Sequence, residues 1–279
     1  MIEFMGIEYA RGATAKITND GPALGPGEIK KMFPDYKWTT VVADAVTPAD
    51  CARDRFGDAF DVHKKTYVQT PTTRHIMIGG DHSVNFGHFA AMADRIKNQE
   101  LCLVYIDAHL DIHTPESSRI QASGAPHGTN VRALLGDGDS RWLGLIKNKP
   151  ALKPQNLFYL ATRAYEPAEI EYAREQNIFI RTASQLQSDA DWQNAVREIR
   201  TAIGNRPFVV SFDFDAIDPK LFSDVLVPEP NGISLDAAKY FVTQFHDATG
   251  FEFVEYAPNG DAQSAQIAHD LISIVVAND

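Results

Sequence analysis

Residues 101–111 read LCLVYIDAHLD and join an apolar run to a cluster of ionisable side chains. The run before Asp107 is typical of a buried strand. Asp107, His109 and Asp111 then follow at every second position. Side chains alternate along an extended backbone, so this spacing turns all three toward one side. The stretch therefore predicts a metal site at the carboxyl edge of a sheet, where open α/β sheets bind their ligands.

Two other segments repeat this arrangement. Residues 208–219 read FVVSFDFDAIDP, so an apolar run again ends in alternating acids, Asp213 and Asp215. Residues 75–83 read HIMIGGDHS and bring His82 to the end of a third run. We interpret the three strand ends as parts of one site.

Strand-like and helix-like segments alternate along the chain, with about eight of each. This pattern predicts a mainly parallel sheet covered by helices on both faces, but it does not distinguish an open sheet from a (β/α)8 barrel. No repeat or linker interrupts it, which favours a single domain over residues 1–279. Residues 136–155 are expected to be irregular surface. We expect strands at 2–9, 39–46, 75–79, 101–111, 156–163, 178–181, 208–213 and 252–257, and helices at 27–33, 50–68, 85–98, 129–135, 167–176, 189–203, 235–248 and 261–276.

Composition excludes several classes of protein. The net charge of -11 argues against nucleic acid as a partner, because such proteins normally present a basic face. No apolar run approaches the roughly 18 residues of a membrane span. Two cysteines, Cys51 and Cys102, provide no disulfide framework. Met1 leads directly into a strand-like run without a signal-peptide layout, so we expect a cytoplasmic protein without membrane contact.

Six side chains are candidate metal ligands: His82, Asp107, His109, Asp111, Asp213 and Asp215. Oxygen-rich sets with some imidazole suit Mn²⁺ or related divalent ions. Six ligands are too many for one tetrahedral zinc, but they fit two ions that share bridging carboxylates. Two such ions, roughly 3.5–4 Å apart, lower the pKa of a bound water toward neutrality. Any one of these acids alone would be read as a helix cap or a solvated loop residue.

The motifs carry a family resemblance. GGDHS at residues 79–83, DAHLD at 107–111 and SFDFDAIDP at 211–219 resemble the three signature motifs of the arginase/agmatinase (ureohydrolase) family. His127-Gly128 and the segment VEYAP at residues 254–258 also resemble that family in order and spacing. The resemblance implies a three-layer α/β/α fold with an eight-stranded, mainly parallel sheet. It also implies a homo-oligomer, either a trimer or a hexamer.

The resemblance further implies roles for single residues. Two Mn²⁺ ions or similar divalent ions would be bound per chain, one by His82, Asp107, Asp111 and Asp213 and the other by Asp107, His109, Asp213 and Asp215. Asp111 would also accept a hydrogen bond from the attacking hydroxide. Glu255 would pair with the substrate guanidinium, and His127, which normally titrates near neutrality, would shuttle a proton.

Several positions depart from the family pattern near the substrate. His113 stands where the family has an asparagine after its DAHxD motif, and Ala125 replaces a second asparagine that helps hold the substrate α-carboxylate. Ser123 is retained, and Glu166 stands where an aspartate faces the α-amino group. The loop at residues 224–228 also differs. We expect Ser123, Glu166 and His113 to bind substrate.

The leading hypothesis is therefore a metal-dependent hydrolase that cleaves the guanidino group of arginine, or of an arginine-like compound, to urea and an amine. Agmatine, guanidino acids and formimidoylglutamate are the competing substrates. A different class remains open, namely a catalytically weak metal-binding regulatory relative. Only the altered recognition loops support that alternative.

Overall fold

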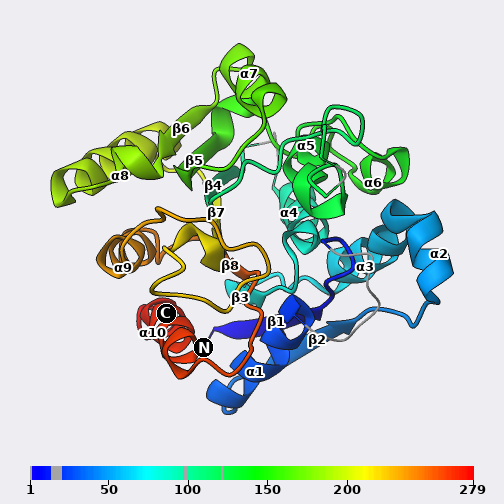
Figure 1. The fold of residues 1–279 in the computed structure, drawn as a ribbon, viewed down its shortest axis with the longest axis horizontal. Coiled ribbons are helices and arrows are strands. Elements are labelled where there is room, and N and C mark those ends of the chain that lie inside the picture. The colour runs from blue at the N-terminus through cyan, green and yellow to red at the C-terminus, as the bar shows by residue number, and fades with distance from the viewer. Residues whose placement is uncertain (1, 14–20, 97–99, 121) are drawn as a thin grey trace.

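A single sheet of eight parallel strands forms the centre of the protein (Figure 1). The computed structural model describes residues 2–13, 21–96, 100–120 and 122–279. The strand order is β2-β1-β3-β8-β7-β4-β5-β6, and every neighbouring pair is parallel. The strands are β1 (Glu3–Glu8), β2 (Trp38–Val42), β3 (His75–Ile78), β4 (Cys102–Ile106), β5 (Leu157–Thr162), β6 (Phe179–Thr182), β7 (Phe208–Asp213) and β8 (Gly250–Val254).

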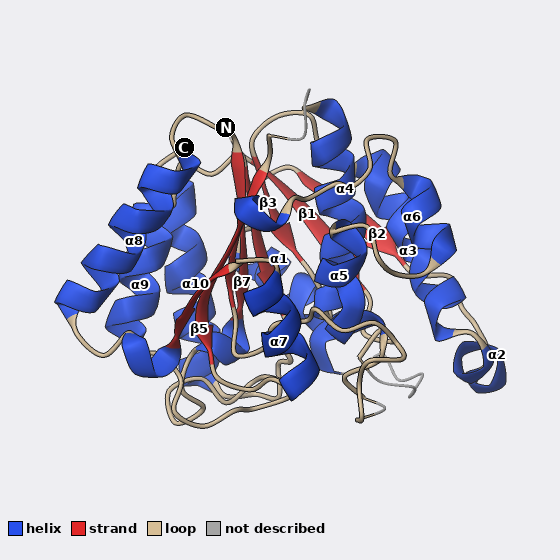
Figure 2. Cartoon of the chain, turned by 90° about the horizontal axis from the view of Figure 1, so that it is seen from above, coloured by secondary structure: helices blue, strands red, loops and turns tan. Residues whose placement is uncertain are grey.

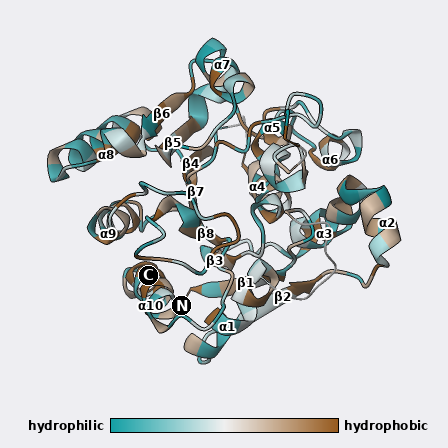
Figure 3. Cartoon of the chain, in the orientation of Figure 1, coloured by the Kyte–Doolittle hydropathy of each residue, from teal (hydrophilic) through white to brown (hydrophobic). Residues whose placement is uncertain are grey.

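Helices cover both faces of this sheet, which Figure 2 shows edge-on between the two layers. Helices α1 (Gly25–Met32), α8 (Asp189–Ile203), α9 (Leu235–Gln244) and α10 (Ala262–Ala277) contribute to one hydrophobic core. The other core takes residues from α3 (Arg55–Gln69), α4 (Asn85–Arg95), α5 (Asn130–Leu134), α6 (Ser140–Leu145) and α7 (Pro167–Glu175). Figure 3 shows the corresponding pattern, with hydrophobic strands inside and hydrophilic stretches on the outer helices.

The predicted α/β/α architecture is confirmed, and the barrel alternative is wrong. The sheet is open, because β2 and β6 each have only one neighbour among the described strands. Strands β3, β4 and β7 are buried along their full length, as expected for a parallel sheet covered on both faces.

Several element boundaries predicted from the sequence are wrong. The helix expected at 50–68 is two helices, α2 (Pro48–Arg53) and α3, because the backbone leaves the helical region at Asp54, which caps α3 by accepting from Gly57 N at 2.8 Å. Helix α6 lies within the span expected to be irregular, where Asp139 caps it. The strand expected at 101–111 ends at residue 106, and that expected at 252–257 ends at residue 254. The last residues of the helix expected at 85–98 lie outside the described residues.

Four neighbouring strands, β3, β8, β7 and β4, end at the same level of the sheet. Register pairs Ile78 with Phe253, Phe253 with Phe212, and Phe212 with Ile106. Gly79, Asp107 and Asp213 follow directly after three of these residues, and Glu255 comes two residues after Phe253. Segments up to 173 residues apart in sequence therefore meet at one edge of the sheet, as the bond from His82 N to Glu255 illustrates.

Two features bear on the surroundings of the protein. Cys51 and Cys102 are both buried and unpaired with each other. Among the residues that the structure describes, none of the helices combines the length and apolar character that a membrane crossing requires.

Candidate metal centre and active site

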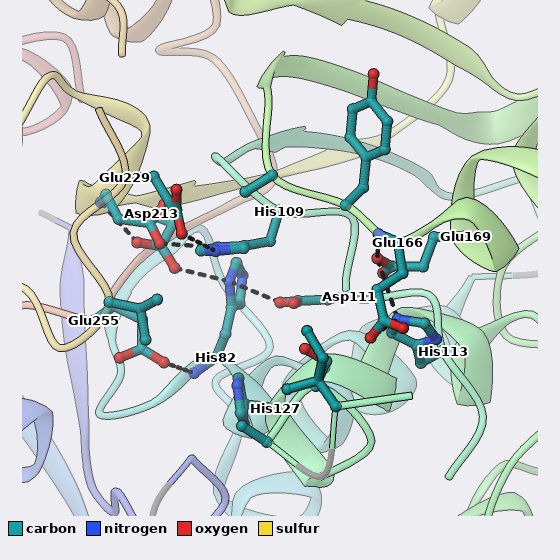
Figure 4. A pocket seen from close by; sticks show the side chains of 18 residues that line it. His82, His109, Asp111, His113, His127, Glu166, Glu169, Asp213, Glu229 and Glu255 are labelled. Atoms are coloured by element: carbon teal, nitrogen blue, oxygen red, sulfur yellow. Dashed lines mark hydrogen bonds and ion pairs between the residues drawn. The ribbon is translucent and has the colours of Figure 1, made fainter. Parts of the chain in front are cut away.

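A cavity of about 340 Å³ opens at the carboxyl ends of the central strands. Ten of the eleven site residues predicted from the sequence line it, and Figure 4 shows most of them converging. The eleventh, Asp107, is completely buried and contacts the lining residues His82 and His109. The predicted convergence of the three strand ends is thus present in the structure.

The first group of candidate ligands surrounds His82, which begins the short 3-10 helix η2 (His82–Val84) after β3. Its Nδ1 lies 2.9 Å from Asp107 Oδ2, 3.1 Å from Asp213 Oδ2 and 3.5 Å from Asp111 Oδ2. Its other nitrogen, Nε2, lies 2.9 Å from Ser211 Oγ of β7. Ser211 thereby fixes the ring so that Nδ1 faces the three carboxylates.

The second group surrounds His109. Its Nδ1 lies 3.0 Å from Asp215 Oδ2 and 3.3 Å from Asp107 Oδ1. Asp107 therefore contacts both histidines, one with each carboxylate oxygen. Glu229, which the sequence analysis missed, lies 3.9 Å from Nε2 of His109. The sequence feature that could have pointed to Glu229 is its position between two prolines in the loop after the third motif.

These residues are suitable for holding divalent ions. Potential ligand atoms of His82, Asp107 and Asp111 lie within 4.8 Å of one another, as do those of Asp107, His109 and Asp215. Oδ2 of Asp107 is buried and makes no hydrogen bond, although it lies 2.9 Å from His82 Nδ1. A buried carboxylate oxygen without a hydrogen-bond partner is costly unless a cation satisfies it. Carboxylate oxygens with imidazole nitrogens are a donor set that Mn²⁺ accepts.

The excess of negatively charged groups in the cluster also favours the binding of cations. Burial and the neighbouring Asp107 raise the pKa of Asp111 to about 7. Burial and the charges of Asp215 and Asp107 raise the pKa of Asp213 well above its usual value. Although burial opposes their charged forms, the adjacent aspartates raise the pKa values of His82 and His109. Bound protons thus partly neutralise the negative charge of these crowded acids, and a bound divalent ion would displace them.

Two candidate residues adopt a left-handed backbone, with φ of 51° at Asp111 and 63° at Glu255. Both follow a strand end, so the chain turns sharply where the expected strand would have continued. The side chains at 107, 109 and 111 consequently converge through a turn rather than through strand alternation. Residues other than glycine rarely occupy this region, and such outliers gather at functional sites.

Glu255 lies deep in the cavity next to His82. Its Oε1 accepts from the main-chain N–H of His82 at 2.9 Å, whereas its Oε2 is buried without a partner. Burial and the charges of Asp213 and Asp81 raise its pKa well above the usual value. Gly80 supports this contact, because its carbonyl accepts from Glu255 N at 2.8 Å, and a Cβ there would lie 1.7 Å from the Tyr9 carbonyl oxygen.

His127 lies in the 3-10 helix η4 (Pro126–Thr129) and points toward the cavity (Figure 4). Its Nδ1 lies 3.1 Å from the Gly12 carbonyl oxygen, which can only accept, so Nδ1 carries the proton. Burial lowers the pKa of His127 to about 4, which differs from the near-neutral value expected of a loop histidine. Near neutral pH the ring is therefore uncharged, and its Nε2 has a free lone pair.

A second set of residues forms the outer wall of the cavity. His113 is 1% exposed, and its Nε2 lies 3.2 Å from both Glu166 Oε1 and Glu169 Oε2. Glu166 also accepts from the Ser118 hydroxyl at 2.6 Å and from the main chain of Arg119 at 2.9 Å. Although burial opposes it, the two glutamates raise the pKa of His113. The sequence analysis missed Glu169, which resembles an ordinary first-turn acid of α7.

Tyr105 supports the cluster from within β4 and was also missed. Its ring stacks on His82, with centroids 4.4 Å apart and planes 6° apart. Its hydroxyl donates to Asp111 Oδ2 at 2.7 Å. In the sequence it looked like one more core residue of the strand, because alternation cannot show that a buried ring has a polar partner.

Together, the open α/β/α sheet and the paired histidine–aspartate groups define a protein with a candidate binuclear metal centre. Solved arginases share its fold. The structure resembles *Bacillus subtilis* arginase with a TM-score of 0.82 and 22% identity, covering 100% of this chain and 99% of that one. It resembles *Entamoeba histolytica* arginase in complex with L-ornithine with a TM-score of 0.85 and 21% identity, covering 99% and 98%.

The sequence profile of the arginase family matches residues 9–277, and this chain belongs to that family. The *Entamoeba histolytica* arginase is 31% identical over 193 residues, which are 66% of this chain and 62% of that protein. The *Neurospora crassa* arginase is 29% identical over 210 residues, 71% of this chain and 57% of that protein. The matches thus span about six tenths of the length of these curated relatives.

Proposed function

We propose that this protein is a metal-dependent hydrolase that cleaves the guanidino group of arginine, or of an arginine-like compound, to urea and an amine. The observation that carries the proposal is the position of Asp107, which contacts His82 and His109 with different oxygens. A carboxylate shared in this way suits two adjacent ions. Membership of the arginase family supports the same reaction.

In this proposal two Mn²⁺-class ions occupy the site. His82, Asp107, Asp111 and Asp213 would hold one, and Asp107, His109, Asp213 and Asp215 the other. When bound, the ions would supply positive charge and lower the pKa of a water molecule. The shared position of Asp107 and the contact of Asp213 with His82 support this assignment.

The remaining residues would position the substrate and move a proton. Glu255 would hold the guanidinium through its unpartnered Oε2. Asp111 would accept a hydrogen bond from the attacking water. His127 would take a proton from solvent at Nε2 and release it to the nitrogen of the leaving amine as the C–N bond breaks. Ser123, His113 and Glu166 would contact the rest of the substrate.

The test is urea release from arginine, agmatine and guanidino acids, and formamide release from formimidoylglutamate, by protein that has been stripped of metal and then supplied with Mn²⁺. We expect urea from guanidino substrates only after metal is restored. Two ions bound per chain without any turnover would instead indicate a metal-binding regulatory relative. Turnover restricted to formimidoylglutamate would show that the substrate is a formimino compound and not a guanidino compound.

We also propose, on the family resemblance, that the protein is a homo-oligomer, either a trimer or a hexamer. The two buried free cysteines support a cytoplasmic location, where thiols stay reduced. Analytical ultracentrifugation and cell fractionation test these points. A monomer at micromolar concentration would contradict the first, and exclusive recovery from another compartment the second.

A further inference from the structure

The segment that follows β1, residues 9–13, lies against His127. The carbonyl oxygen of Gly12 lies 3.1 Å from Nδ1 of His127 and accepts from the main-chain N–H of the same residue at 3.4 Å. Arg55, the first residue of α3, donates from Nη2 to this oxygen at 2.9 Å. A carbonyl oxygen has two lone pairs, so the guanidinium and the imidazole can both donate to it. Gly12 thereby joins Arg55 to His127.

The backbone of this segment is held in place by Asp81. A carboxylate oxygen of Asp81 accepts from the main chain of Ala13 at 3.0 Å, and the main chain of Asp81 donates to the Tyr9 carbonyl at 2.8 Å. A Cβ atom on Gly12 would lie 2.7 Å from Asp81 Oδ1 and closer still to Ser83 Oγ, and these two atoms are hydrogen-bonded to each other. The close approach therefore requires glycine, and it presents the Gly12 carbonyl in one fixed direction.

The position of Arg55 is not explained by the helix that carries it. The positive end of the helix dipole disfavours a positive side chain in the first turn. Asp54 caps the helix, and Asp58 is the acid of its first turn. The Nε atom of Arg55 is buried and has no hydrogen-bond partner among the described residues, so the guanidinium gives up water to reach Gly12. Such burial is costly, which favours a role for this contact beyond the stability of α3.

The tautomer of His127 determines whether the ring can accept a proton from the cavity. With the proton on Nδ1, Nε2 keeps a free lone pair, whereas with the proton on Nε2 the lone pair of Nδ1 would face the Gly12 carbonyl oxygen and be repelled by it. Burial lowers the pKa of His127 to about 4, and the positive charge of Arg55 contributes to this lowering. The ring is therefore neutral near neutral pH, and only its Nδ1-protonated tautomer can take up a proton at Nε2.

We propose that Arg55 is a positioning residue for the proton transfer, because it holds the Gly12 carbonyl as the acceptor that keeps the His127 proton on Nδ1. This inference rests on the proposed function. Arg55 is not among the described residues that line the cavity, so it acts on the reaction through Gly12 and His127. Without its guanidinium, the carbonyl can turn toward other donors, and His127 can exchange to the tautomer whose Nε2 no longer accepts a proton.

Arg55→Met in the Mn²⁺-loaded enzyme is the first test, because methionine keeps an unbranched side chain but lacks the donors and the charge. We expect kcat for arginine to fall at least about 10-fold, the scale of a lost hydrogen bond from a charged group, with KM and bound Mn²⁺ unchanged. Arg53→Met is the matched control, because the Arg53 side chain is 77% exposed and pairs with Asp50 on α2. A wild-type kcat in Arg55→Met, or an equal fall in Arg53→Met, overturns the proposal.

The tautomer itself provides a measurement that does not depend on turnover. In protein that carries diamagnetic Cd²⁺ in place of Mn²⁺, ¹⁵N NMR of the histidine rings reports which nitrogen bears the proton, and His127→Ala identifies the His127 signals. We expect a protonated Nδ1 in the wild type and in Arg53→Met, and a shift toward protonated Nε2 in Arg55→Met. The same tautomer in all three proteins overturns the proposal.

The two proposals fail in different ways. A wild-type protein that releases urea from no guanidino substrate would refute the proposed function. The NMR comparison of Arg55→Met with the wild type would still decide whether Arg55 sets the tautomer of His127.

Discussion

Two of the buried clusters of histidine and carboxylate among the described residues lie at different levels of the same sheet. The candidate metal centre lies at the carboxyl ends of the strands. The other cluster, here called the sealed cluster, consists of His75 at the start of β3, His88 and Asn85 of α4, and Glu252 of β8. All four of these side chains are 0–1% exposed.

The sealed cluster pairs its own charges. His75 Nδ1 donates to the Thr73 carbonyl oxygen at 2.7 Å, so its Nε2 accepts from His88 Nε2 at 2.6 Å. His88 Nδ1 then meets Glu252 Oε1 at 2.5 Å, and Asn85 donates to Glu252 Oε2 at 2.6 Å. Each ring nitrogen and each carboxylate oxygen has one partner.

The candidate metal centre has the opposite balance. Four aspartates surround two histidines, Oδ2 of Asp107 makes no hydrogen bond, and the nearby Glu255 Oε2 has no partner. The comparison indicates that histidine next to an acid does not by itself identify a ligand site. An excess of carboxylates with unsatisfied oxygens does, because bound cations can satisfy these oxygens.

The largest effect is expected when the acid shared by both ligand groups is removed. Asp107→Ala should abolish metal binding at both groups and eliminate essentially all urea release. Metal per chain measured by elemental analysis checks this. The matched control is Glu252→Gln in the sealed cluster, which should keep its metal content. Retention of both ions by Asp107→Ala would show that an unsatisfied carboxylate oxygen does not distinguish a metal centre from the sealed cluster.

His127→Ala should lower turnover by roughly 10²–10⁴-fold, the usual contribution of a positioned acid–base group. Metal content should remain normal, since His127 belongs to neither ligand group. The pKa of about 4 means that the proton-accepting form prevails near neutral pH and is lost as the pH falls through that value. Wild-type kcat/KM should decline in that direction, and metal content is measured in parallel because protonation of the aspartate and histidine ligands also weakens metal binding as the pH falls. Loss of an ion in the variant would assign His127 to the ligands.

Tyr105→Phe tests whether the residues behind the metal centre hold its ligands in place. The variant keeps the ring stacked on His82 but loses the donor to Asp111. We expect Mn²⁺ affinity to fall about 10–100-fold, as is typical for partners of metal ligands. Direct titration of Mn²⁺ provides a measurement that does not depend on activity. Tyr159→Phe is the control, because that hydroxyl donates to a main-chain carbonyl, at Leu110. Equal losses of Mn²⁺ affinity in both variants would indicate a general loss of packing around the site and not a specific effect of the Tyr105 hydroxyl.

The smallest effect on turnover is expected in the sealed cluster. Glu252→Gln removes the charge that pairs with His88, and loss of one partner of a buried ion pair typically lowers the free energy of unfolding by about 3–5 kcal/mol. Urea release per folded molecule should not change. Denaturant unfolding and an active-site titration check the two parts. Lys37→Ala breaks an exposed pair with Glu3 and should cost no more than about 1 kcal/mol. A stable but inactive Glu252→Gln would show that the sealed cluster positions the site.

The sequence was sufficient for the architecture and for the grouping of the candidate ligands. Alternating apolar segments predicted the parallel sheet, and three strand ends with acids and histidines predicted the convergence near Asp107. The reason given for that convergence was partly wrong, because β4 ends at residue 106 and Asp111 turns into the left-handed region. A positive φ at an aspartate is imposed by tertiary contacts and leaves no trace in local spacing.

Other features could not be read from single segments. The lowered pKa of His127 depends on burial by residues distant in sequence and on the Gly12 carbonyl. The partners of Tyr105 and Glu169 appear only when strands and loops are assembled. Similarly, His88 gave no sign that it would contact Glu252, 164 residues away. Such contacts depend on tertiary packing, which periodicity does not encode.

The strand order has a consequence for how the protein is assembled during synthesis. The last strand to emerge, β8, lies in the middle of the sheet between β3 and β7. Without it, the described strands form two half-sheets that share no strand pairing, β2-β1-β3 and β7-β4-β5-β6. The second half already carries Asp107, His109 and Asp215, whereas His82 belongs to the first. One ligand group can thus form on a partial chain, and the other is completed only when the final strand joins the halves.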